Sequence, residues 1–150
     1  MSHDRRSSRI LAMQALCQWE IQRDESSPSL ADFLAGQEAS PQATAYASKL
    51  VQELWRHRAE IDERVASASV KWDLARISPV ERNTMRVAIV ELLGGKVPAA
   101  VVLDEAIEIG REYGGAESPR FINGVLDAVF KGIQDVSANA LERWREIDLR

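Results

Sequence analysis

The segment 78–93, SPVERNTMRVAIVELL, constrains the fold more than any other part of the chain. Ser78, Pro79 and Glu81 predict a helix start: a capping serine, a proline at the first helical position and a glutamate three residues after the serine. Seven of the ten residues in 84–93 are apolar, and a helix that is apolar on nearly every side must be buried by neighbours. Gly94 and Gly95 can supply the left-handed helix end. The sequence therefore predicts a buried central helix.

Apolar residues recur with the helical period in four further segments. These segments are 9–22, 43–55, 98–113 and 118–133. A short turn at 30–34 and a second weak helix starting near Glu60 complete the pattern, and no stretch alternates as a strand does. We expect an all-α fold of about six or seven helices, with 1–133 as one helical domain and 134–150 as a charged tail that is itself helical.

Chain length, the longest apolar run and the net charge limit the class of protein that this sequence can encode. A chain of 150 residues fits a single domain. No apolar run approaches the roughly 20 residues of a membrane span, and the N-terminus lacks the apolar core of a secretory signal. We therefore expect a cytoplasmic protein with no membrane association. The formal net charge of −4 argues against a generic nucleic-acid binder.

The residues that could bind a metal or take part in catalysis each have a simpler structural explanation. His3 and His57 lack ligand-spaced partners, so neither predicts a metal site. Cys17, the only cysteine, lies among core-forming residues without a neighbouring base, which favours a small packed side chain over a nucleophile. The adjacent carboxylates Asp104 and Glu105 fit a solvated helix face. The sequence predicts a binding protein and not an enzyme, by elimination.

Two places could bind an anionic strand. Arg5, Arg6 and Arg9 lie at or just before the expected start of the first helix and could contact phosphates, although short basic ends are common without that role. The segment 118–123, SPRFIN, places a serine, an arginine and a phenylalanine at another helix N-terminus, where an aromatic ring could stack a base. The alternative is that this phenylalanine belongs to the core and the serine and proline only start the helix.

Four segments together resemble the NusB family of transcription antitermination factors. They are RILAMQALCQWE, SPVERNTMRVAIVELL, VPAAVVLDEAIEIGREYGG and ESPRFINGVLDAV, in this order from residue 9 to residue 129. The resemblance implies two small helical bundles, no cofactor and no catalysis. It also implies that the protein pairs with NusE, a protein of the small ribosomal subunit. The pair would bind single-stranded boxA RNA in the RNA polymerase antitermination complex and promote transcription, notably of ribosomal RNA operons.

The resemblance assigns roles to particular positions. The residues implied to face RNA are Arg5, Arg6, Arg9, Ser118, Arg120 and Phe121. Cys17 and Glu81 are implied to face NusE, while the capping box offers a plain alternative role for Glu81. Ser7 and Ser8 interrupt the basic run, and Cys17 stands where the family often has tyrosine, so we expect both contacts to be weaker than in other members.

Two further readings stay open. The chain could be a self-associating helical scaffold, with a homodimer formed through the faces used for partners. It could also be an accessory domain for an RNA-modifying enzyme, because similar helical domains are fused to RNA cytosine methyltransferases; 150 residues leave no room for the second domain that such an enzyme needs. For the leading interpretation, the net charge of −4 predicts weak RNA binding by the chain alone and stronger binding with a basic partner.

Overall fold

A computed structural model describes residues 2–22, 28–69, 77–135, 138–145 and 149. Its helices are α1 (Ser2–Gln22), α2 (Pro28–Ala35), α3 (Pro41–Arg56), α4 (Arg58–Ala68), α5 (Pro79–Gly94), α6 (Ala99–Tyr113), α7 (Ser118–Gln134) and α8 (Ala138–Arg145). Within these ranges there is no strand, which confirms the all-α class. The described helices number eight, and the expected six or seven are exceeded because the tail contributes α8. No helix in the described ranges has the length and apolar character needed to cross a membrane.

Helix α5 is the buried centre of the molecule. The capping box is present in full: the Glu81 N–H donates to Ser78 Oγ at 3.2 Å and the Ser78 N–H donates to Glu81 Oε1 at 3.3 Å. Every residue from 83 to 94 is buried. Gly95 ends the helix with φ of 69°, a left-handed value that suits glycine. The central helix predicted from the sequence is confirmed.

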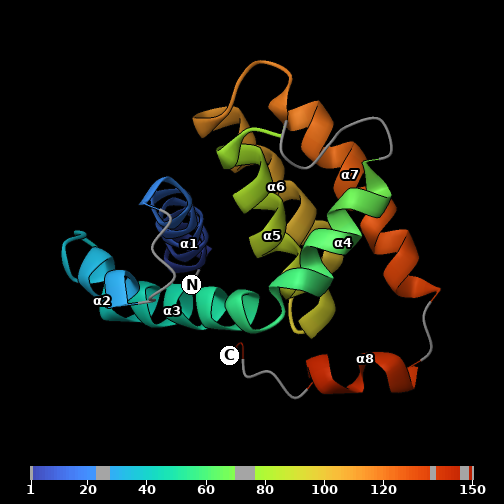
Figure 1. Ribbon diagram of the computed structural model, residues 1–150, viewed down its shortest axis with the longest axis horizontal. Coiled ribbons are helices and arrows are strands. Elements are labelled where there is room, and N and C mark those ends of the chain that lie inside the picture. The colour runs from blue at the N-terminus through green and yellow to red at the C-terminus, as the bar shows by residue number, and fades with distance from the viewer. Residues whose placement is uncertain (1, 23–27, 70–76, 136–137, 146–148, 150) are drawn as a thin grey trace.

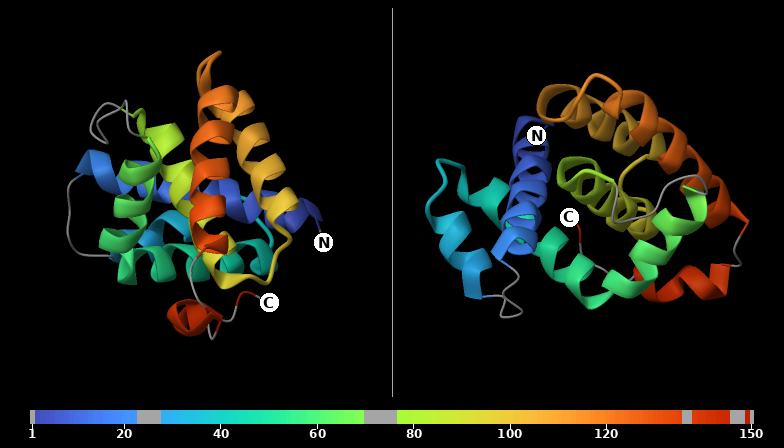
Figure 2. Two further views of the ribbon diagram at one scale, coloured as in Figure 1. Left: turned by 90° about the vertical axis from the view of Figure 1, so that its right-hand side faces the viewer. Right: turned by 45° about the horizontal axis from the view of Figure 1, so that its top comes forward.

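Two small bundles share this helix (Figure 1). In the first bundle α1, α2 and α3 pack against one another, and α1 and α3 also contact α5. In the second bundle α4, α6 and α7 pack around the other sides of α5, with α6 and α7 lying against each other along their lengths. Figure 2 shows α1, a helix of the first bundle, crossing beside α5 and α6.

Helix α1 begins earlier than predicted. It starts at Ser2, and the arginines that we expected at or before the helix start lie inside its first turns. Helical geometry places residues four apart on one face and turns each successive residue by about 100°. Arg5 and Arg6 therefore point in different directions, which matters for what each can bind.

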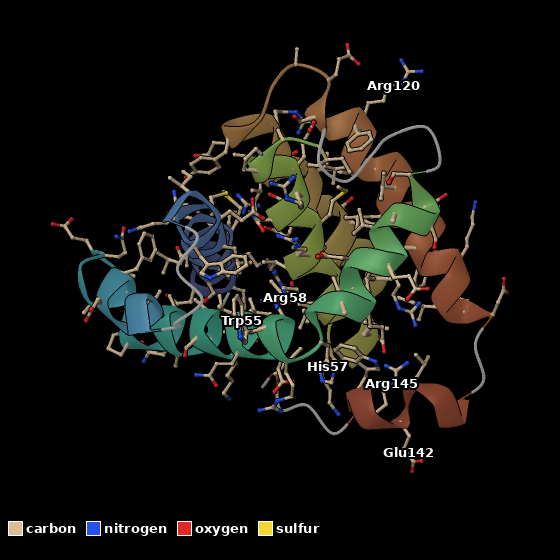
Figure 3. All side chains as sticks on the ribbon, viewed as in Figure 1. Trp55, His57, Arg58, Arg120, Glu142 and Arg145 are labelled. Carbon is tan, nitrogen blue, oxygen red and sulfur yellow. The ribbon has the colours of Figure 1, made fainter. Side chains whose placement is uncertain are left out.

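The tail packs onto the body through α8. Its buried apolar residues are Leu141, Trp144 and Leu149. The Trp144 ring lies 4.2 Å from the His57 ring, centroid to centroid, and its Nε1 donates to Glu60 Oε2 at 3.0 Å. The Arg145 guanidinium occupies the space that a Cβ at Gly95 would need. The side chains in Figure 3 show Arg145 and His57 on the same side of the tail helix. Residues 70–76, between α4 and α5, lie outside the described residues.

Candidate nucleic-acid interface

Arg9 is buried in an ion pair with the central helix. Its Nε donates to Glu91 Oε1 at 2.7 Å and its Nη2 donates to Glu91 Oε2 at 3.0 Å, with side chains only 7% and 1% exposed. The Tyr46 hydroxyl donates to the same carboxylate at 2.6 Å. Burial and the Glu91 charge raise the pKa of Tyr46 well above its usual value, so the hydroxyl stays a donor. We expected Arg9 to face RNA; in this structure its guanidinium is buried and fastens α1 to α5.

Arg6 is exposed but paired. Its Nε and Nη2 donate to the two carboxylate oxygens of Glu105 on α6, at 2.8 and 2.9 Å. The Arg6 side chain is 50% exposed and that of Glu105 is 17% exposed. The hydrogen bond from Arg6 lowers the pKa of Glu105, which therefore stays ionised and offsets the arginine charge. Sequence reasoning assigned Glu105 to a solvated face and missed this pair, because nothing local links residues 99 positions apart.

Arg5 lies against α3 instead of a carboxylate. Its Cζ is 3.5 Å from the centroid of the Tyr46 ring, a cation–π contact. Beside it a groove of about 490 Å³ opens between α1 and α3, and Gln42 and Lys49 line its α3 side. Sequence reasoning missed this groove. Its one signal was the spacing of Gln42, Tyr46 and Lys49, which places all three on one face of a helix.

Ser118 starts α7 but is buried, with 3% of its surface exposed. Its hydroxyl accepts from the Gly115 N–H at 2.9 Å and donates to Glu81 Oε2 at 2.8 Å. Gly114 leaves room for this arrangement, since a Cβ there would collide with Ser118 Oγ. We expected Ser118 to face RNA; in this structure its hydroxyl ties the α6–α7 loop to the start of α5. The same bond joins a residue assigned to RNA with one assigned to the partner.

The other two residues at the start of α7 differ in exposure. Arg120 is exposed and extends away from the body (Figure 3). Phe121 is half-buried and packs against the core, so only part of its ring can meet a base. Glu105 lies nine residues before Gly114, the C-cap of α6, which corresponds to about 13 Å at 1.5 Å per residue. The arginines of α1 therefore meet α6 near its middle, while the α7 start lies beyond its C-terminal end.

Cys17 and the start of α5 form a separate, more apolar region. Asn83 Nδ2 donates to Cys17 Sγ at 3.4 Å, and burial raises the pKa of the thiol, which suits a packed side chain and not a nucleophile. A hollow of about 440 Å³ is lined by Cys17, Val80, Ile21 and Tyr113, among others. Ile21 is 79% exposed and Tyr113 is 39% exposed. Exposed apolar side chains around a hollow are typical of a protein-binding surface.

The described residues offer little for metal chemistry. Among them, no three histidine, cysteine, aspartate or glutamate side chains are grouped so that they could hold an ion. The Glu81 carboxylate is occupied by the helix cap and by Ser118. The candidate site is therefore a set of binding surfaces: arginines and a groove at one end of α1, and an apolar hollow at the other.

Solved structures with this architecture are antitermination factors. NusB of T. maritima superimposes with a TM-score of 0.78 and 32% identity, covering 93% of this chain and 96% of that chain. A crystal structure of the antitermination factors NusB and NusE in complex with dsRNA also gives 0.78, with 26% identity, covering 88% of this chain and 99% of that chain. The fold is thus that of the helical transcription antitermination factors.

Sequence comparison identifies the family. Residues 6–131 match the model of the NusB family. The transcription antitermination protein NusB of Syntrophus aciditrophicus is 35% identical over 130 residues, 86% of this chain and 81% of the relative. That of Anaeromyxobacter dehalogenans is 37% identical over 134 residues, 89% of this chain and 94% of the relative. The chain belongs to the NusB family of transcription antitermination proteins, which are not enzymes.

Proposed function

We propose that this protein pairs with a NusE ribosomal protein, and that the pair binds single-stranded boxA RNA within the RNA polymerase antitermination complex. The pair then promotes processive transcription, notably of ribosomal RNA operons, in the cytoplasm where those transcripts arise. The observation that carries the proposal is the division of α1: arginines at its N-terminal end, and an exposed apolar hollow at its C-terminal end. The structural relative crystallised with NusE and RNA supports pairing of this kind.

The hollow supports the protein contact. Ile21 projects from the end of α1 with 79% of its surface exposed, and Tyr113 borders the same hollow from α6. Cys17 lines it directly, while Glu81 follows Val80, another lining residue. Because the Glu81 carboxylate already accepts from Ser118, we assign it the role of holding the edge of the hollow, with the apolar residues making the main contact.

The charges explain why RNA binding needs the partner. Arg9 is buried, and Glu105 offsets Arg6, so few of the arginines at the start of α1 add net attraction for phosphates. The protein carries a formal net charge of −4, which opposes binding of a polyanion. A basic ribosomal protein at the hollow would supply the missing positive charge.

A titration tests this proposal. Labelled boxA RNA is titrated with the full-length protein alone, with NusE alone and with both, at two salt concentrations, and fluorescence anisotropy is recorded. We expect weak binding by the protein alone and an increase of at least about tenfold in affinity with both proteins, which falls as salt rises. An RNA of equal length and scrambled sequence is the control. Equal affinity with and without NusE would contradict the proposal.

Self-association is a second candidate, favoured by the same exposed hollow. Two copies could cover Ile21 and Tyr113 mutually, and the resulting homodimer would hide the partner surface. Light scattering across a dilution series gives the oligomeric state, and adding NusE shows whether dimer and heterodimer compete. A dimer that NusE does not dissociate would favour the scaffold interpretation over the adaptor.

A further inference from the structure

The three N-terminal arginines do not present equal charge to solvent. Arg9 and Glu91 form a buried pair, and Arg6 and Glu105 form an exposed one. In the part of the chain that the structure describes, Arg5 contacts an aromatic ring and forms no ion pair. Of the three, Arg5 is the arginine whose charge no carboxylate among the described residues offsets through an ion pair.

Arg5 also lines a groove of suitable size. The groove between α1 and α3 has a volume of about 490 Å³, within the range of roughly 300–1,000 Å³ found for small-molecule sites. Its lining includes Asp4, Gln42 and Lys49. Asp4 Oδ1 accepts from the Ser40 hydroxyl at 2.9 Å, so this carboxylate is engaged in the α3 cap.

We propose that this groove takes one nucleotide of the bound RNA, with its base stacked on the Arg5 guanidinium and a phosphate next to Lys49. The inference rests on the proposed RNA-binding function and adds to it the path of the strand. Neither α3 nor its residues Gln42 and Lys49 were assigned to RNA by the sequence.

The stacking follows from the position of Arg5. A Cζ 3.5 Å from the Tyr46 centroid places the planar guanidinium on the ring face. Tyr46 is itself held by its hydrogen bond to Glu91, so the ring is a fixed support. A guanidinium has two faces, and a base can stack on the one that the ring does not cover. The ring thus orders the arginine before RNA arrives, which lowers the entropy cost of binding.

Charge and hydrogen bonding at the groove suit a single-stranded nucleotide. Lys49 supplies a second positive charge on the α3 side, one turn from Tyr46. Gln42 is exposed on the first turn of α3, and its amide both donates and accepts, as recognition of a base edge requires. A duplex would hold its base faces inside the stack and could not use the Arg5 face.

The test compares substitutions within the protein–NusE complex. Anisotropy titrations with labelled boxA RNA use Arg5→Ala, Arg5→Lys, Lys49→Gln and Gln42→Ala. Loss of one stacked base predicts that Arg5→Ala weakens binding about tenfold. Arg5→Lys keeps the charge but loses the planar group, so we expect most of that loss to remain. Lys49→Gln should reduce the salt slope by about 0.7, the value for one phosphate contact on a single strand.

Two comparisons make the result decisive. Arg6→Ala should weaken binding less than about threefold, because Glu105 already offsets its charge. Arg111→Ala removes an exposed arginine that pairs with Glu108 on α6, outside the groove, and controls for general charge. Circular dichroism and NusE binding check that each variant folds.

The outcomes separate this inference from the function on which it rests. If the unsubstituted complex does not bind boxA RNA, the proposed function fails. If it binds, but Arg5→Ala weakens binding no more than Arg6→Ala or Arg111→Ala, the groove does not hold a nucleotide. Full affinity in Arg5→Lys would overturn the stacked geometry. A large loss in Arg5→Ala that Arg5→Lys does not restore supports the inference.

Discussion

The two ends of α1 are both fastened to the central helix by ion pairs, but with opposite arrangements of charge. At the N-terminal end the arginine is on α1 and the carboxylate is Glu91 on α5. At the C-terminal end the carboxylate is Glu20 on α1, and it accepts from Arg82 and Arg86 on α5. Arg86 also pairs with Asp62 of α4, with Nε to Oδ1 at 2.7 Å.

What remains exposed differs between the two ends. The N-terminal end presents Arg5 and a polar groove, whereas the C-terminal end presents Ile21 and an apolar hollow. The two residues are 16 positions apart, which corresponds to about 24 Å along a helix. The comparison teaches that one rigid helix, held at both ends, can keep an RNA-facing and a protein-facing surface at a fixed separation.

The largest loss of stability should come from breaking the buried Arg9–Glu91 pair at the N-terminal end of α1. Glu91→Gln removes the hydrogen-bonded counter-charge of the buried Arg9 guanidinium and leaves it only Glu105, at 4.0 Å. Breaking a buried pair in this way costs about 3–5 kcal/mol of unfolding free energy. Urea unfolding followed by circular dichroism measures it. Glu108→Gln on the exposed face of α6 is the control, with an expected change within about 0.5 kcal/mol. A loss below about 1 kcal/mol in Glu91→Gln would show that the buried pair does not secure this end.

At the C-terminal end of α1, the stability of the fold should depend less on the carboxylate of Glu20. Glu20 is half-buried, so solvent screens part of its interaction with Arg82 and Arg86, and we expect Glu20→Gln to cost about 1–3 kcal/mol. The same urea experiment measures this loss. If Glu20→Gln lowers the unfolding free energy more than Glu91→Gln does, the C-terminal end of α1 is the more strongly fastened of the two, contrary to our expectation.

The exposed residues should separate the two binding surfaces. Ile21→Ser removes an exposed side chain, so stability should change within about 0.5 kcal/mol. Affinity for NusE should fall about tenfold, because a buried apolar contact of about 1.5 kcal/mol is lost at the interface. Calorimetric titration with NusE measures it. Val101→Ser is the matched control, since Val101 is 43% exposed on α6 and does not line the hollow.

The smallest effect is the acid dependence of the Glu20 end. Burial alone would raise the pKa of Glu20, but the hydrogen bonds and charges of Arg82 and Arg86 lower it overall. A folded pKa below the unfolded value of about 4.3 means that the stabilisation is complete above that pH and is lost as pH falls through the folded pKa. The stabilities of the unsubstituted protein and Glu20→Gln should therefore converge below about pH 4. Urea unfolding at pH 7, 5, 4 and 3 checks this; a constant difference would contradict the assignment.

Local signals were enough to predict the central helix and the fold class. Ser78, Glu81 and Gly95 act within one or two turns of helix, and their roles can be read from neighbouring residues alone. Helix α1 was predicted from residue 9 because residues 2–8 are mostly polar. Those residues become helical through contacts with distant partners, including the Ser8 hydroxyl, which donates to the Ala43 carbonyl at 2.7 Å.

The sequence was enough to predict which kinds of residue form the candidate site, but not which partners those residues contact or how deeply they are buried. The arginines of α1 are recognisable in the sequence, but whether each is free depends on Glu91 and Glu105, which lie 82 and 99 residues away. Ser118 matched a family position, yet its burial depends on the space that Gly114 leaves. The family match ends at residue 131, so it gave no information on how the tail packs.

The docking of α8 has a consequence for the order in which the protein folds. Trp144 is fully buried, and the Arg145 guanidinium covers Gly95 at the end of the central helix. During synthesis from the N-terminus, the two bundles can assemble around α5 while its last turn is still open to water. That turn is covered only once α8 and Leu149 are in place, and these are the last described parts of the chain to be synthesised.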